Sequence, residues 1–157
     1  MTSAERPRFA VVPAAYVYLL REAPDGRTEV LLQQRGDVPF MAGHWAAGAA
    51  GHVEDGETAP VAALREAAEE LGLTGVDLEL LTTMQRRHSD APIDQRVDFL
   101  FTARRWAGEP RIMETAKATA LDWFALDALP EPMVPHEAYA LGLLAAGGVP
   151  ALVSFGF

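Results

Sequence analysis

The sequence contains no cysteine, which excludes disulfide bonds, thiolate metal sites and a cysteine nucleophile. It is also poor in basic residues, with 13 Lys and Arg against 22 Asp and Glu, and its formal net charge is −9. Because nucleic-acid-binding proteins usually carry a basic surface that neutralises phosphates, this balance argues against a nucleic-acid partner. A phosphate-bearing ligand would instead need a metal ion between itself and the acidic protein. No apolar run approaches the roughly 18–20 residues of a membrane helix, so no membrane span is expected.

The apolar run at residues 9–20 follows Arg6 and Arg8, an arrangement that imitates a secretory leader. Pro13 interrupts the run, and the segment Tyr16 to Leu19 is rich in strand-forming residues. We therefore interpret it as a first strand and expect a cytoplasmic protein. A chain of 157 residues, half of them hydrophobic, fits one domain. The expected organisation is a single domain over residues 1–157.

Hydrophobic periodicity and turn residues predict one α/β domain with a mixed sheet. Strands are expected at residues 9–20, 28–34, 45–50, 78–87, 96–105 and 118–124. Helices are expected at residues 58–71 and 135–146. The apolar tail at residues 149–157 is expected to pack back onto the domain.

The first predicted helix places three carboxylates at i, i+3 and i+4, namely Glu66, Glu69 and Glu70. These positions converge on one helical face, where like charges repel by roughly 0.2–0.5 kcal/mol per pair. The helix is expected to begin after Thr58 as N-cap and to end at Gly72. A solvated acidic face is the common alternative to a metal site, and the spacing alone leaves both open.

The same helix carries apolar residues on another arc. An advance of about 100° per residue puts one set on the side opposite the carboxylates, namely Val61, Leu64, Ala68 and Leu71. This arc is predicted to be buried and the acidic face to be exposed.

Residues 51–73 combine the carboxylates with a fixed pattern of glycines and charges. The pattern consists of Gly51, Glu57, Arg65, Glu66, Glu69, Glu70, Gly72 and Leu73. It resembles the Nudix box of the Nudix (MutT-like) hydrolases, and every charged and glycine position of that signature is filled. The one departure is Ala67, where the family usually has a larger aliphatic residue. The resemblance extends to residues 30–35, 43–45 and 121–130, and so to residues 11–144 as a whole.

The resemblance implies the Nudix fold, an α/β/α sandwich with a mixed β-sheet, and hydrolysis of the diphosphate bond in a nucleoside diphosphate linked to another group. Magnesium is the implied cofactor, with manganese as the alternative ion. Glu66 and Glu70 are its first-choice ligands, and Gly51 would add a main-chain carbonyl. Glu69 would bind a second ion or polarise the attacking water.

Other residues receive supporting roles from the same resemblance. Glu57 and Arg65 look like the orienting pair, for which a structural salt bridge is expected, and Gly72 ends the helix. Glu114, in a later loop, competes with Glu69 as general base.

Substrate residues lie outside the box. Arg35, Arg86 and Arg87 are candidates to reach phosphates, although solvated strand arginines are the ordinary alternative. Trp45 and Phe40 are candidates to stack on a base, and core or loop packing is the alternative role of Trp45. The histidines, His44, His52, His88 and His136, are expected to be surface or packing residues.

Two further functions share the implied fold. A non-catalytic nucleotide sensor would often lack box carboxylates, which are present here. An isopentenyl-diphosphate-isomerase-like enzyme relies on a cysteine, which is absent. The expected partner is a small nucleoside diphosphate derivative, with a homodimer suggested by family habit alone.

Overall fold

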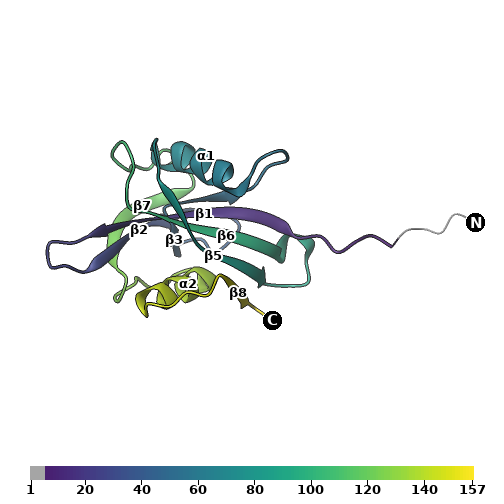
Figure 1. Ribbon diagram of the computed structural model, residues 1–157. Helices are drawn as coiled ribbons and strands as arrows, with labels where there is room; N and C mark the ends of the chain where they lie inside the picture. The colour runs from purple at the N-terminus through teal and green to yellow at the C-terminus, as the bar shows by residue number, and fades with distance from the viewer. Residues whose placement is uncertain (1–5) are drawn as a thin grey trace, which may run out of the picture.

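A mixed β-sheet lies between two helices in the computed structural model, which describes residues 6–157 (Figure 1). The strands are β1 (Val12–Glu22), β2 (Thr28–Arg35), β3 (Trp45–Ala47), β4 (Ala49–His52), β5 (Leu78–Arg87), β6 (Gln95–Ala103), β7 (Ala118–Ala125) and β8 (Leu152–Phe155). The helices are α1 (Ala59–Leu71) and α2 (Pro135–Ala145), with a 3-10 turn at Pro92–Asp94. Figure 1 shows α1 on one face of the sheet and α2 on the other. The predicted fold class is confirmed.

The long strand β1 organises the sheet. It pairs in parallel with β6, while β4 and β2 pair with it antiparallel along its first and second halves. The order β3-β2-β1-β6-β5-β8 follows, and β7 pairs with β2. Each face of the sheet has its own hydrophobic core, and alternate β1 residues belong to one or the other. Val17 and Leu19 pack on the α1 side, and Tyr18 and Leu20 on the α2 side.

The strands nearest the two ends of the chain differ in detail from the prediction. β1 begins at Val12 instead of Phe9, because its parallel partner offers its first pairing residue at Arg96, opposite Val12. Phe9 is 74% exposed. At the other end, β8 pairs in parallel with β5, so the apolar tail extends the sheet. Within residues 6–157, no helix has the length and apolar character needed to cross a membrane.

Helix α1 begins and ends as predicted. Thr58 caps it, with its hydroxyl oxygen accepting from the Val61 N–H at 3.3 Å. Gly72 ends it with φ of +70°, a left-handed conformation that favours glycine, and its N–H donates to the Ala68 carbonyl at 3.1 Å.

The buried face of α1 differs from the prediction. Leu71 is buried as expected, but Val61 and Leu64 are 51% and 42% exposed, and Ala68 is exposed as well. The buried residues are Ala62, Ala63, Glu66, Ala67 and Leu71. Small alanines allow the helix backbone to approach the sheet closely, and this turns Glu66 inward instead of out to solvent. The prediction was wrong because it relied on the spacing of the larger apolar residues, whereas alanines form the face of α1 that contacts the sheet.

Candidate active site

Helix α1 and strand β4 place two carboxylates against one stretch of backbone. The Ala50 N–H donates to Glu70 Oε2 at 2.7 Å. A Cβ built on Gly51 would lie 2.1 Å from Glu66 Oε1, so the Glu66 carboxylate fills the space beside Gly51. Gly51, Glu66 and Glu70, predicted as metal ligands, are therefore brought together by the fold.

Arg65 ties the loop before α1 to the helix. Its Nε and Nη2 donate to the two carboxylate oxygens of Glu57, each at 2.8 Å, and Nη2 also donates to the His52 carbonyl at 3.1 Å. These bonds hold the pKa of Glu57 at about 2, assisted by the Glu54 backbone N–H. The predicted support pair is thus a bidentate ion pair, a geometry that fixes both partners.

Arg65 also reaches the acidic face. Its Nη1 donates to Glu66 Oε1 at 2.7 Å and to Glu69 Oε2 at 3.3 Å. The Glu69 side chain is half-exposed, whereas Glu66 is buried. Glu69 therefore stands at the solvent edge of the group.

The loop that carries Glu114 is anchored at both ends. The backbone N–H of Met113 donates to the Glu70 carbonyl at 3.1 Å, beside Gly72 at the end of α1. The Gly36 N–H donates to the Lys117 carbonyl at 2.8 Å, and the Lys117 ammonium lies 2.6 Å from Glu114 Oε2. Glu114 is consequently held next to the carboxylates of α1.

The site has an excess of negative charge. The pKa of Glu70 is raised to about 8, chiefly by burial and also by the nearby Glu66 and Glu114 carboxylates, while the hydrogen bond from the Ala50 N–H opposes the rise. Burial also raises the pKa of Glu66, opposed by Arg65. Such crowding of hard oxygen donors suits a divalent cation.

The donor set fits magnesium or manganese in type. Within residues 6–157, no three His, Asp or Glu side chains are gathered as a metal-ligand group. The ion pairs of Arg65 engage two of the candidate carboxylates instead. Glu66, Glu70 and the Gly51 carbonyl are the oxygen donors that would hold such an ion.

A cleft of about 420 Å³ adjoins Glu70 and opens toward the α2 side of the sheet, where Tyr16 and Glu137 line it. Its wall includes Gly51 and Glu70, and two of the predicted substrate residues, Arg35 and Arg86, line it. Sequence reasoning gave no site role to several other lining residues, namely Tyr16, Gln33, Arg96, His136 and Glu137. They come from four different elements, and no spacing in the chain indicates that they meet.

Arg86 belongs to a buried ionic group. Its Nε donates to Asp98 Oδ2 at 2.7 Å, and Arg96 lies opposite it on β6. Arg96 also reaches the end of β4, with Nη1 3.1 Å from His52 Nε2. Asp98 Oδ1 also lies 3.9 Å from Arg96 Nε, so one buried carboxylate faces two guanidinium groups that line the cleft, and guanidinium groups suit an anionic ligand.

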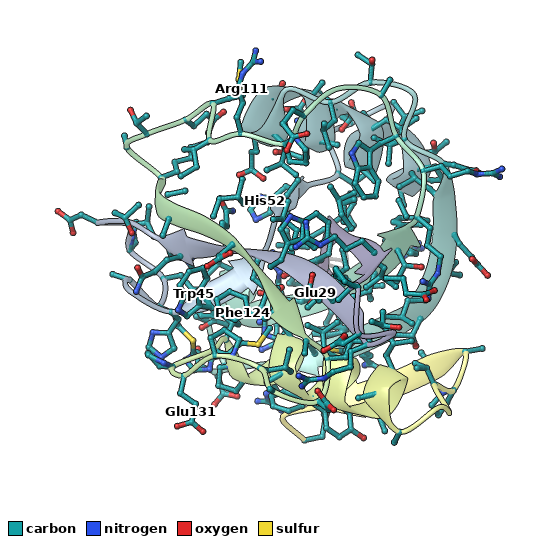
Figure 2. All side chains as sticks on the ribbon, turned by 90° about the vertical axis from the view of Figure 1, so that its left-hand side faces the viewer. Glu29, Trp45, His52, Arg111, Phe124 and Glu131 are labelled. Atoms are coloured by element: carbon teal, nitrogen blue, oxygen red, sulfur yellow. The ribbon has the colours of Figure 1, made fainter. Side chains whose placement is uncertain are left out.

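Arg35 and Trp45 have different surroundings. The Nε of Arg35 donates to the Phe40 carbonyl at 2.7 Å, and both residues line the cleft. The Trp45 ring packs edge-on against Phe124, with ring centroids 4.7 Å apart, and is not among the lining residues. Figure 2 shows these two rings side by side, away from His52. Packing is thus the role that the structure shows for Trp45.

Known proteins similar to this chain belong to one family. The family model for the NUDIX domain matches residues 11–144. No curated protein sequence matches the chain. Among solved structures, a MutT NUDIX hydrolase from Burkholderia pseudomallei is 32% identical, with a TM-score of 0.73, and the match covers 85% of this chain and 97% of that one.

Two further solved structures carry a nucleotide derivative in their names. The NUDIX domain of Shewanella oneidensis NrtR, complexed with ADP ribose, is 23% identical, with a TM-score of 0.70 and coverage of 87% and 88%. A C. elegans Ap4A hydrolase binary complex is 25% identical, with a TM-score of 0.63 and coverage of 87% of this chain and 96% of that one. At these identities the NrtR likeness concerns the fold.

Proposed function

The chain belongs to the Nudix family of hydrolases, and on this premise we propose that it hydrolyses the diphosphate bond of a nucleoside diphosphate linked to another group, with magnesium as cofactor. The observation that supports this most directly is the joint placement of Glu66 and Glu70 against the backbone of β4, where Gly51 and Glu70 line a cleft of about 420 Å³. Ligand pockets commonly span about 300–1,000 Å³.

Each box residue has a task in this reaction. Glu66, Glu70 and the Gly51 carbonyl would hold the cation, and Arg65 with Glu57 keeps the loop and the helix in register. Bound Mg²⁺, or Mn²⁺ in its place, would offset the charge on the diphosphate and its leaving group. Arg86, 6% exposed and fixed by Asp98, would contact phosphate oxygens from the cleft.

Water attacks phosphorus, and the anhydride P–O bond breaks as the proton passes to a carboxylate. Glu114 is the proposed base, because its loop is anchored to the end of α1 and its charge acts on Glu70. Glu69 is the competitor, and each of the two carboxylates has a cationic partner, Arg65 at 3.3 Å for Glu69 and Lys117 at 2.6 Å for Glu114.

The substrate class follows from the family and from the ligands named for related structures. ADP ribose, bound by the NrtR domain, and Ap4A, named for the nematode hydrolase, both contain a nucleoside diphosphate. We extend this class to the present chain and propose Arg35 as a further phosphate contact. The single domain over residues 1–157, the cytoplasmic location and the homodimer stay predictions.

A release assay tests the proposal. Purified protein with magnesium is given nucleoside triphosphates, nucleotide sugars, ADP-ribose and dinucleoside polyphosphates, with Glu70→Gln as the matched control. Release from at least one compound by the parent and not by the control is the expected result. No release from any compound would contradict the proposal and would favour the nucleotide sensor.

A further inference from the structure

Lys117 is the only lysine in the sequence, and every other basic residue is an arginine. Its ammonium lies 2.6 Å from Glu114 Oε2, a carboxylate oxygen that is itself buried. The Lys117 backbone N–H donates to the Glu114 carbonyl at 3.0 Å, so a tight turn brings the two residues together. The one ammonium side chain of the chain therefore faces the proposed active site.

The carboxylates of the site have little other positive charge beside them. Arg65 pairs with Glu66 and Glu69, and within residues 6–157 no Lys or Arg nitrogen lies within 4 Å of the Glu70 carboxylate. Burial raises the pKa of both Glu66 and Glu70, and the charge of Lys117 acts against that rise. Lys117 thus supplies positive charge that Arg65 does not provide.

The backbone holds the Glu114 turn without help from the lysine side chain. The Gly36 N–H donates to the Lys117 carbonyl at 2.8 Å, and a Cβ on Gly36 would lie 2.9 Å from the Ala116 carbonyl oxygen. On the other side, the Met113 N–H donates to the Glu70 carbonyl at 3.1 Å. The turn is therefore packed on both sides through main-chain atoms, and the ion pair is not what fixes its position.

The two cations of the site differ in how firmly they are held. The Arg65 side chain is 24% exposed and makes a bidentate pair with Glu57, whereas the Lys117 side chain is 61% exposed and has one carboxylate partner. A guanidinium binds carboxylates through a rigid fork, while an ammonium is a point charge on a flexible stem. A lysine at this position can neutralise the carboxylates and still move away from them.

We propose that Lys117 is a displaceable counter-ion of the metal site, which neutralises the carboxylates while no ion is bound and is repelled from them when a divalent cation binds. The inference rests on the proposed function, which places the ion at Glu66 and Glu70. The bound ion carries twice the charge of the ammonium and becomes the dominant local charge. Displacement of Lys117 frees the Glu114 carboxylate for its proposed role as base.

Calorimetric titration with magnesium chloride, without substrate, tests this role. Lys117→Met should bind the ion about 2- to 10-fold more tightly than the parent, because a unit charge that repels the divalent ion has been removed. Lys117→Arg keeps the charge and should bind no more tightly than the parent. Arg104→Met removes the same charge from an exposed position directly after β6, and it should keep the parental affinity.

Salt separates a charge effect from a change in the shape of the site. The difference between the parent and Lys117→Met should shrink as salt rises from about 0.05 to 0.5 M, because salt screens exposed charges. If Lys117→Met does not fold, Lys117→Gln replaces it, and the same result is expected.

Parental or weaker magnesium binding in the charge-removing variant would overturn the inference. So would tighter binding in Lys117→Arg, equally tight binding in Arg104→Met, or a difference that salt leaves unchanged. The expected order of affinities without hydrolysis of any compound removes only the proposed reaction. Hydrolysis with equal affinities in the parent and Lys117→Met removes only the counter-ion, and no magnesium binding by the parent removes both.

Discussion

The Glu66 carboxylate occupies the space that any side chain on Gly51 would need. A Cβ at Gly51 would lie 2.1 Å from Oε1 and 2.3 Å from Cδ of Glu66. The helix approaches this closely because Ala62, Ala63 and Ala67 form its buried face. The contact therefore brings the Gly51 backbone at the end of β4 next to the first carboxylate of α1.

Gly51→Ala should push Glu66 out of position. We expect kcat to fall at least tenfold, and stability to fall by about 1–3 kcal/mol through overpacking. Gly142→Ala is the control, since nothing lies within 4 Å of a Cβ there, and it should stabilise the helix by about 0.5–1 kcal/mol. Steady-state kinetics and chemical denaturation measure both effects. Parental activity in Gly51→Ala would show that the close contact is dispensable.

Magnesium should stabilise the folded protein through linkage. At an ion concentration one hundred times the dissociation constant, about 2.7 kcal/mol is expected, or roughly 5–10 °C in Tm for a chain of this size. Glu70→Gln keeps an acceptor for the Ala50 N–H but removes a charged ligand, so its shift should be much smaller. Thermal melts with and without the ion give the comparison. An equal shift in the variant would remove Glu70 from the ligand set.

Replacing Glu69 and Glu114 separately distinguishes a base from a ligand. Loss of the base should lower kcat about 10²- to 10⁴-fold without changing the magnesium concentration that gives half the maximal rate. We expect this pattern for Glu114→Gln, and a higher magnesium requirement for Glu69→Gln. Glu109→Gln, exposed in the loop before Glu114, should behave as the parent. The opposite assignment of the two patterns would make Glu69 the base.

Glu137 should make the protein less stable as pH rises. Its pKa is raised from 4.5 to about 7 in the folded state, so the folded protein holds the proton more tightly than the unfolded chain. The stabilising contribution of the protonated form is complete below pH 4.5 and is lost as pH rises through 7.

Comparison with Glu137→Gln isolates this effect from other groups. The free energies of unfolding of the variant and the parent should differ little below pH 4.5. As pH rises to about 7, the variant should become more stable than the parent by about 3 kcal/mol. Urea denaturation at a series of pH values gives the difference curve. A flat difference between pH 4 and 8 would mean that the carboxyl titrates normally.

Local patterns predicted most of the elements. Thr58 and Gly72 mark the ends of α1 because capping depends on a few neighbouring residues. The alternation of apolar residues along β6 and the turn residues before β2 likewise predicted those two strands from local sequence. The buried face of α1 was wrong, because the depth of packing on β4 depends on the alanines and on Gly51, which is distant in sequence from the helix residues that it contacts.

The sequence by itself determined the family of this protein, because the box residues from Gly51 to Gly72 lie within the end of β4, one loop and α1, where spacing sets relative position. The cleft was decided by tertiary structure alone. Tyr18 and Glu137 are 119 positions apart, and Tyr16 and His136 are 120 apart, yet each pair meets within hydrogen-bonding distance. Such contacts depend on how α2 packs on β1. That packing follows from the burial of whole faces, and no local pattern in the chain encodes it.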